Sequence, residues 1–323
     1  MLLHRRSART GRSQEAGSAG RAGAVALRIR RTLSQRKHSV AHHITGLDHT
    51  VHAVTDLEAA KANWQRLGFT LTPRGRHIGW ATGNYCIMFP RNYHELLGIA
   101  EPGGYTAGVE DLLKAKGPGV HKVVLGIDDA GAAVQELKAS GLNPSEPQDL
   151  KRELELPEGT VLPGFSLVHL PPEATPQLSM FLCQHLTPEL LRKPDWLLHP
   201  NGAQQIASVI VAVDNPPALE LPYETLVGAG AAVRTDRMVA VRAGEETVLF
   251  VTPDDLDTLF PDIDHPVRPT PYVAGLRFRV HNTEAAAAYF KAAGVEHARS
   301  LDGTVLVPAS VADGIFLEFS NRA

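Results

Sequence analysis

The sequence predicts an α+β fold built from four copies of one strand–helix–strand module. The first observation is a repeated segment that opens with a His and reaches an Asp seven residues later, at 49–56 and at 121–128. The second is the helix-forming run after each Asp, where a helix N-cap is expected. The third is that the same form recurs twice more, with Ala207 and Ala274 in the place of the histidine. A recurring unit of this kind predicts a fold assembled from copies of it.

The first module is expected to contain one strand, one helix and three further strands. Residues 47–53 alternate in the period of two that is typical of a strand, and His49 lies on one of its faces. The helix expected over 57–67 ends at Gly68, a residue type common at helix C-caps. Three more strands are expected at 69–73, 85–89 and 93–97.

The second module repeats this order. Its helix is expected to end near Lys138, with Gly141 just beyond it, and its later strands are expected near 152–156, 165–169 and 178–185. The resulting division of the chain is a basic head (1–43), a first domain (44–186, with modules 44–100 and 118–186), a connector (187–204) and a degenerate second domain (205–320, with modules 205–253 and 270–320).

Composition narrows the class of protein. The chain has 323 residues, of which 43% are apolar and 21% charged, as in ordinary globular domains. No apolar run is long enough to span a bilayer, and two cysteines do not make a disulfide framework, so reduced thiols in the cytoplasm are expected. We expect a small-molecule substrate, no nucleic-acid or membrane partner, and a monomer or homodimer.

Charge is distributed unevenly along the chain. Residues 1–43 carry ten basic residues and one acidic residue, which leaves 22 basic and 34 acidic residues in the body, a net charge of −12. An acidic body argues against nucleic acid as the main partner. The head has three interpretations: a disordered arm, an organelle presequence, or sequence upstream of the true start. We favour a head without a role in the chemistry.

Several motifs resemble the vicinal oxygen chelate superfamily, which includes glyoxalase I, extradiol dioxygenases and bleomycin-resistance proteins. The resemblance is carried by the paired βαβββ modules, by Leu47-Asp48-His49 at the start of the first strand, and by Glu95 within 93–97. Three segments resemble its glyoxalase-like branch more closely, at 68–77, 92–98 and 184–190. The resemblance covers 44–200 closely and 205–320 by module pattern. It implies that the modules form two paired half-barrels.

The resemblance also implies a set of metal ligands. In glyoxalase I each of two modules contributes one ligand from its first strand and one from its last. The matching positions here are His49, Glu95, His121 and Gln184, with His185 as the alternative to Gln184 if the register differs by one. Such a set suits a divalent ion of zinc, nickel, manganese or iron with positions open for substrate. Glu95 is the expected catalytic residue, because it could detach and act as a base.

A second group of residues is expected to contact the substrate. The loop 74–77 carries Arg74, Arg76 and His77, and two guanidiniums on a glycine-containing loop can hold a carboxylate or phosphate. A solvated turn is an equally good interpretation of that loop. Asn84 and Tyr93 could line the same cavity or pack in the core.

Two classes of function remain open from the sequence. The first is a metal-dependent lyase or isomerase of the glyoxalase type, acting on a small carbonyl or vicinal-oxygen compound, with an extradiol-type dioxygenase as a related enzyme. The second is a metal-free binding or resistance protein whose cleft holds a small molecule.

Overall fold

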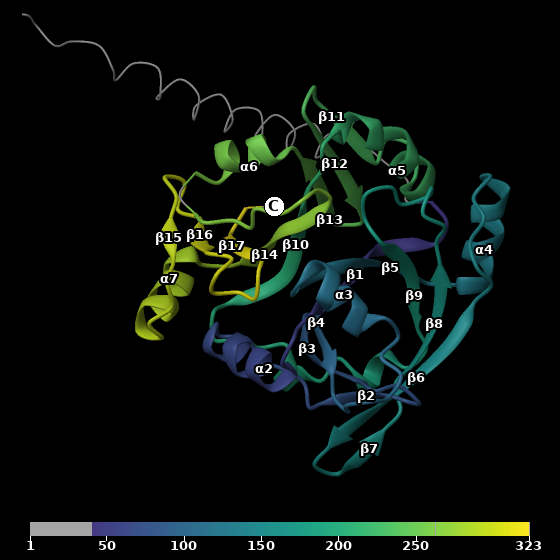
Figure 1. Ribbon diagram of the computed structural model, residues 1–323, viewed down its shortest axis with the longest axis horizontal. Coiled ribbons are helices and arrows are strands. Elements are labelled where there is room, and N and C mark those ends of the chain that lie inside the picture. Colours follow the sequence, from purple (N-terminus) through teal and green to yellow (C-terminus); the bar gives the residue numbers. More distant parts are fainter. Residues whose placement is uncertain (1–40, 262, 323) are drawn as a thin grey trace, which may run out of the picture.

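Two β-sheets, one from each half of the chain, form the frame of the protein (Figure 1). The structure is a computed structural model that describes residues 41–261 and 263–322. The first sheet has nine strands in the order β2-β3-β4-β1-β5-β9-β8-β6-β7, and a further pairing of β2 with β6 closes it into a barrel. The second has eight strands in the order β11-β12-β13-β10-β14-β17-β16-β15.

The first barrel is made of two modules. In each module the first strand pairs in parallel with the last, and the two first strands pair with each other antiparallel at the centre of the sheet. The elements are β1 (Ile44–Ala53), α2 (Leu57–Arg66), β2 (Gly75–His77), β3 (Thr82–Met88), β4 (Tyr93–Ile99), α3 (Val109–Lys116), β5 (Gly119–Ile127), α4 (Ala130–Ala139), β6 (Gln148–Leu156), β7 (Gly159–Val161), β8 (Gly164–His169) and β9 (Met180–His185).

The second half repeats the arrangement after two short 3-10 helices, η1 (Pro188–Leu190) and η2 (Pro194–Trp196). Its elements are β10 (Ala203–Ala212), η3 (Pro216–Leu219), α5 (Glu220–Val227), β11 (Ala232–Arg234), β12 (Met238–Ala243), β13 (Glu246–Val251), α6 (Pro253–Leu259), β14 (Tyr272–Val280), α7 (Thr283–Ala292), β15 (Ala298–Arg299), β16 (Val305–Val307) and β17 (Phe316–Ser320). The predicted α+β class and the four modules are confirmed. Among the described helices, none is long and apolar enough to cross a membrane.

Most of the expected head, residues 1–40, lies outside the described residues. Residues 41–43 are described, and they contact both halves of the chain. The amide of Ala41 donates to the Val227 carbonyl at 2.9 Å, and the His42 ring donates to the Thr225 carbonyl at 3.0 Å. The His43 ring bonds the Asp128 carboxylate at 2.7 Å.

The helix N-caps fix the register of the four modules. The N-cap residues are Asp56, Asp129, Asn215 and Asn282. The sequence predicted Asp128 as the N-cap of the second module's helix, and this was wrong by one residue. The Asp128 carboxylate bonds His43, and Asp129 is the N-cap, accepting from the Ala132 amide at 2.8 Å. Each later module is therefore shifted by one residue from the register that the sequence suggested.

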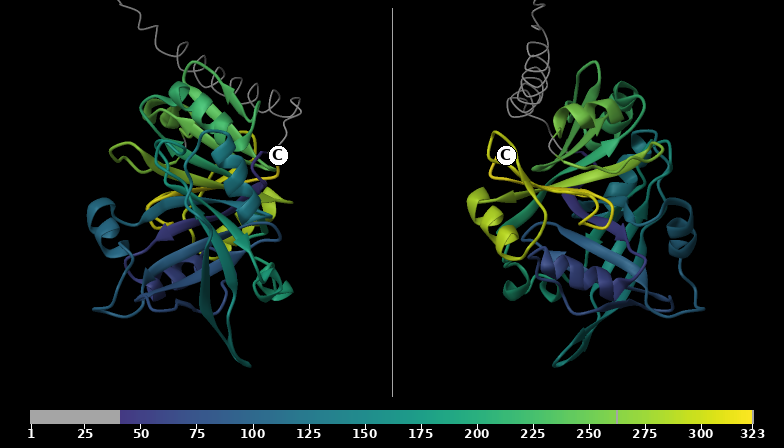
Figure 2. Two further views of the ribbon diagram at one scale, coloured as in Figure 1. Left: turned by 90° about the vertical axis from the view of Figure 1, so that its right-hand side faces the viewer. Right: turned by 60° about the vertical axis from the view of Figure 1, so that its left-hand side comes forward.

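The two halves share one apolar core and keep two separate interiors. The shared core joins residues of β1, β5, β10 and β14 with the inner faces of α2, α4, α5 and α7. The halves lie against each other in all views, and α2 lies beside α7 (Figures 1 and 2). A second apolar cluster fills the interior of the second sheet, where a Cβ on Gly275 would lie 2.5 Å from the Phe316 ring.

A chain of buried histidines crosses between the halves. His52 Nε2 donates to the Asp313 carbonyl at 3.0 Å, so its Nδ1 accepts from His94 Nε2 at 3.2 Å. His94 Nδ1 in turn accepts from the Thr50 hydroxyl at 2.7 Å. Burial lowers the pKa of His52 to about 3, and burial followed by the charge of His52 holds the pKa of His94 well below its usual range.

This arrangement predicts that the protein loses stability as pH falls. Unfolded histidine has a pKa of about 6.5, so below that pH the unfolded chain binds protons that buried His52 and His94 do not. Their contribution is complete above about pH 6.5 and is lost as pH falls toward the folded pKa values. The free energy of unfolding, measured in denaturant between about pH 7 and pH 4, should fall by up to about 1.4 kcal/mol per pH unit for each histidine.

Replacing one of the two histidines tests this cause. His52→Gln should be less stable at neutral pH and should show a shallower dependence on pH. His281→Gln, at an exposed position after β14, is the matched control and should keep the slope of the parent protein. An unchanged slope in His52→Gln would contradict the explanation.

Candidate functional site

The interior of the first barrel holds a cluster of polar side chains. β1 has a bulge between Leu47 and His49, where Asp48 is the extra residue opposite β5. Asp48 and His49 therefore both contribute to the interior. On the neighbouring strand a Cβ at Gly126 would lie 2.8 Å from the Thr45 hydroxyl oxygen, so a glycine there leaves space for the Thr45 side chain, with Asp48 in ordinary contact at 3.5 Å.

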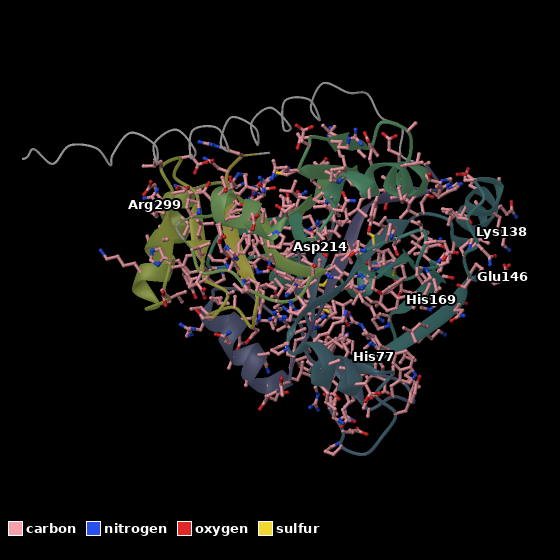
Figure 3. The ribbon with its side chains drawn as sticks, turned by 45° about the horizontal axis from the view of Figure 1, so that its top comes forward. His77, Lys138, Glu146, His169, Asp214 and Arg299 are labelled. Carbon is pink, nitrogen blue, oxygen red and sulfur yellow. The ribbon has the colours of Figure 1, made fainter. Side chains whose placement is uncertain are left out.

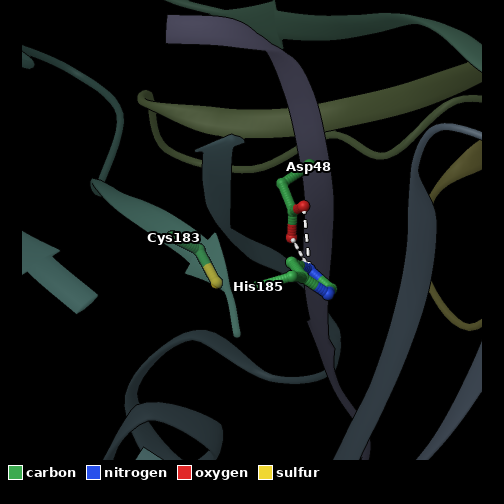
Figure 4. Close-up of side chains that lie close together, drawn as sticks. All are labelled: Asp48, Cys183 and His185. Carbon is green, nitrogen blue, oxygen red and sulfur yellow. Dashed lines mark hydrogen bonds and ion pairs between the residues drawn. The ribbon is translucent and has the colours of Figure 1, made fainter. Parts of the chain in front are cut away.

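Asp48 joins two imidazoles. Its carboxylate accepts from His49 Nδ1 at 2.6 Å and bonds His185 Nε2 at 2.9 Å (Figure 4 shows the pair with His185). Burial alone would raise the pKa of Asp48, but the charge and hydrogen bond of His185, followed by those of His49, hold it well below the usual range. Asp48 therefore stays ionised and fixes the orientation of both rings.

Glu95 lies across the interior from His49. Glu95 Oε2 is 3.8 Å from His49 Nε2, and Glu95 Oε1 accepts from Asn84 Nδ2 at 2.5 Å. Burial works to raise the pKa of Glu95, but the charges of His49, His77 and Arg152 and the Asn84 hydrogen bond lower it overall. Two facing atoms at this separation can share a proton of a substrate or ligate one cation.

The second module does not supply the expected partners for this pair. Equivalent positions in the modules can be found by counting back from the helix N-cap. His49 lies seven residues before the N-cap of its module, Asp56, and the residue seven before Asp129 in module two is the exposed Lys122. On the last strand of module one, Glu95 pairs with Val51, which lies five residues before the N-cap. The equivalent residue of module two is Val124, and its partner on the last strand is Phe181. Neither side chain suits a divalent first-row ion, so the complete four-ligand set does not fit this barrel.

His121 and Gln184 are placed elsewhere. His121 is the extra residue of a bulge in β5, and its Nε2 donates to the Gly117 carbonyl at 2.9 Å. Gln184 points to the start of α4, where it accepts from the Ala130 amide at 3.0 Å and donates to the Asp128 carbonyl at 2.7 Å. The alternative residue, His185, is the one that reaches the interior. The structure thus brings together His49, Glu95 and His185, without His121 or Gln184.

One group of side chains could hold a metal ion. Within the described ranges, the only three His, Cys, Asp or Glu residues whose donor atoms all lie within 4.8 Å of one another are Asp48, Cys183 and His185 (Figure 4). Burial holds the pKa of the Cys183 thiol well above its usual range, so the thiol is protonated without an ion. An ion would have to displace that proton and share Asp48 with two imidazoles.

The corresponding places in the second sheet carry no such pair. Ser208 and Leu249 stand at the positions of His49 and Glu95 in module three, and Gly275 and Glu318 stand there in module four. This corrects the register that put Ala207 and Ala274 at the histidine positions. Glu318 is buried and bonded to Arg277 Nε at 2.7 Å. Module one alone has both a His and a Glu at these positions.

The expected substrate residues divide into two groups. Arg74 and Arg76 are partly exposed and already paired: Glu155 lies 3.6 Å from Arg74 Nη2 and 2.9 Å from Arg76 Nε, and Glu101 lies 2.6 Å from Arg76 Nη1. To bind an external anion as expected from the sequence, Arg74 and Arg76 would first have to break these ion pairs. His77, Asn84 and Tyr93 belong instead to the barrel interior, where the Tyr93 ring stacks on His49 at 4.4 Å.

A cavity of about 310 Å³ lies at the rim of the first barrel, between the β2–β3 and β4–α3 connections. His77 forms part of its wall, with Trp80 and Tyr105 (Figure 3 labels His77 in this part of the molecule). The charge of His77 also acts on buried Glu95. His77 therefore stands between this cavity and the polar interior.

Three interior residues were missed by reasoning from the sequence. Asp48 was noted only as part of a motif, because strand alternation would turn it away from His49 and the bulge was not foreseen. Arg152 was placed on an expected strand with no role. Cys183, a buried thiol, was not expected beside Asp48 and His185 among possible metal ligands.

Comparison with known proteins identifies the family. The sequence matches the family model described as a glyoxalase-like domain over residues 47–227, more than half of the chain. The chain belongs to the glyoxalase-like domain family. This confirms the resemblance to the vicinal oxygen chelate fold that the sequence motifs suggested. None of the curated proteins matches the chain.

Solved structures share the glyoxalase-like fold at low identity. A hypothetical protein from Staphylococcus aureus aligns with a TM-score of 0.58 and 12% identity over 85% of this chain and 98% of its own. A variant of 4-hydroxymandelate synthase from Streptomyces coelicolor aligns with a TM-score of 0.56 and 12% identity over 85% of this chain and 92% of its own. At this identity the likeness establishes the fold alone.

Proposed function

We propose that the first barrel is an acid–base site for a lyase or isomerase reaction on a small oxygenated compound. The observation that carries the proposal is the facing pair of His49 and Glu95, 3.8 Å apart in an interior where they are 5% and 8% exposed. The pair occurs in one module of four, and each member is held by a further side chain, Asp48 or Asn84.

Glu95 is suited to act as the base. Its lowered pKa keeps the carboxylate ionised near neutral pH, and Asn84 holds one oxygen so that Oε2 faces the interior. A carboxylate in this place can take a proton from a carbon next to a carbonyl group and return it to another position. Exclusion of water strengthens the electrostatic interactions on which the transfer depends.

His49 is suited to act on the oxygen of the same substrate. Asp48 accepts from its Nδ1, which leaves Nε2 facing the interior. Nε2 is the atom that can interact with the oxygen that gains negative charge as the carbon loses its proton. Asp48 does not reach the substrate in this scheme. It orients the imidazole and stabilises its charged form.

Solvent exchange tests the role of Glu95. In D₂O, small 2-hydroxy and 2-oxo aldehydes and acids should exchange the hydrogen beside the carbonyl in the presence of the protein, as followed by proton NMR. Glu95→Gln should slow the exchange by about 10²- to 10⁴-fold, because a general base contributes that much. Glu318→Gln removes the carboxylate at the equivalent place of module four and should leave the rate unchanged. Equal rates in Glu95→Gln and the parent protein would contradict the proposal.

A metal-dependent form of this function is a second candidate, favoured by the Asp48, Cys183 and His185 group. Carboxylate, thiolate and imidazole together suit zinc or another first-row divalent ion. Such an ion, when bound, would polarise a carbonyl oxygen of the substrate. His49 and Glu95 lie in the same interior and would keep their roles in binding and proton transfer.

Metal content distinguishes the candidate centres. For protein purified without chelator, the metal-dependent form predicts about one zinc, nickel, manganese or iron ion per chain, lost in His185→Ala and retained in His121→Ala. His121→Ala is the matched control, because its ring bonds a backbone carbonyl away from the group. Metal lost in His121→Ala and kept in His185→Ala would favour the ligand set that the family resemblance implies. If the parent protein contains no metal, the metal-dependent form is wrong and the metal-free acid–base function remains.

A further inference from the structure

One buried arginine of the first barrel has two nitrogens that lack a hydrogen-bond acceptor. Arg152 lies on β6, pairs with His77 where β2 closes the barrel, and is 3% exposed. Its Nη1 donates to the Cys86 sulfur at 3.3 Å, and its guanidinium lies 5.8 Å from the centre of the Phe165 ring. Neither neighbour is an anion, since burial raises the pKa of the Cys86 thiol to about 11. The charge of Glu95 acts on Arg152, but no hydrogen bond or ion pair joins these two side chains. Buried N–H groups without an acceptor are costly, so an acceptor from outside the chain is expected.

The nitrogens of Arg152 that lack a partner are Nε and Nη2. These two atoms form one edge of the guanidinium and direct parallel N–H bonds in the same direction. A carboxylate matches that edge with its two oxygens, in the two-point contact that arginine makes most readily. The unused edge therefore has the shape of a carboxylate site.

The second barrel contains an arginine whose charge is neutralised by the chain itself. Arg277 on β14 donates from Nε to Glu318 at 2.7 Å, and both side chains are largely buried. By contrast, Arg152 makes no ion pair with any described carboxylate. The direct contact that Glu318 provides to Arg277 in the second sheet has no counterpart at the Nε–Nη2 edge of Arg152, where a ligand could provide it.

A second unpartnered atom lies beside Arg152. Asn84 donates from Nδ2 to Glu95, but its Oδ1 is buried without a hydrogen bond. A Cβ built on Gly75 would lie 2.1 Å from Asn84 Oδ1 and 3.2 Å from Arg152 Nη1, so the two side chains meet over this glycine. Because Oδ1 can only accept, the missing partner is a donor such as a hydroxyl group.

We propose that Arg152 and Asn84 form a substrate subsite for a small hydroxycarboxylate, with the carboxylate on the Nε–Nη2 edge and the hydroxyl on Asn84 Oδ1. This inference rests on the proposed function, because Asn84 also holds Glu95, and it names the class of compound on which Glu95 acts. The subsite places a carboxylate on one side of the interior and leaves the His49–Glu95 pair free for the adjacent carbon.

Calorimetric titration with three probes tests the subsite in the parent protein. Lactate carries both groups, lactamide replaces the carboxylate with a neutral amide, and propionate lacks the hydroxyl. Lactate should bind about tenfold or more tighter than either analogue, because each analogue leaves a buried polar group unpaired. Absence of lactate binding, or lactamide binding as tightly as lactate, would overturn the carboxylate assignment. Equal binding of propionate and lactate would overturn the hydroxyl assignment.

Substitution at the arginine locates the effect. Arg152→Lys keeps the charge and loses the two-point edge, so lactate should bind about 10- to 100-fold more weakly. Arg277→Lys is the matched control and should bind lactate as the parent does. Circular dichroism and thermal unfolding establish that both variants fold. The comparison of probes in the parent protein does not depend on either variant.

The outcome is separable from that of the exchange experiment. If Glu95→Gln still exchanges hydrogen as fast as the parent but lactate binding depends on Arg152, the proton-transfer function is wrong and the subsite stands. If exchange requires Glu95 but Arg152→Lys binds lactate unchanged, the function stands and the subsite is overturned.

Discussion

In three of the four modules, a side-chain hydrogen bond at the start of the helix anchors the strand that precedes it and so bears on which side chains face the interior. The side chain of Asp56, Asp129 or Asn282 accepts an amide of the first helical turn, and this anchors the end of the preceding strand. Because side chains alternate along a strand, a cap displaced by one residue would exchange the inner and outer faces of the whole strand. His49 lies seven residues before the N-cap Asp56 and faces the interior, and Lys122 has the equivalent place because the helix after its strand is capped by Asp129.

The fold could be predicted from the sequence, and so could the part of the site that module one contributes. Repeated strands and caps predicted four modules, and the first module predicted His49 and Glu95 together. The second module contains adjacent aspartates, Asp128 and Asp129, either of which could cap a helix. Local sequence does not decide between them, since the choice depends on His43, which bonds Asp128 from a distant part of the chain.

Long-range pairing explains the other gaps in the sequence interpretation. Arg152 faces Glu95 only because β2 pairs with β6 and closes the barrel, a contact between residues more than seventy positions apart. Asp48 reaches the interior through a bulge that depends on its pairing with β5. Neither contact leaves a periodic pattern in the sequence. The polar interior therefore becomes visible only after the strands have been placed.

A buried cluster with several charges depends on complete pairing. Asp48 is satisfied by two imidazoles, and Glu95 is held by an amide and by nearby positive charge. The same low dielectric that strengthens these contacts makes any missing partner expensive. For the small oxygenated substrate that we propose, a molecule that completes the pairing would be favoured and one that leaves a polar atom unmatched would be rejected.

The apolar core shared by the two halves has a consequence for how this chain could be divided. Ile206, Val209 and Val211 of β10 pack in the same cluster as Leu47, Val123 and Leu125 of the first sheet. A fragment cut at the connector would expose that face to water, and a large exposed apolar face favours aggregation. The second half, although the interior of its own sheet is filled, thus shields an apolar face of the first half from water. The two halves can differ in the chemistry of their interiors while each still depends on the other to cover this face.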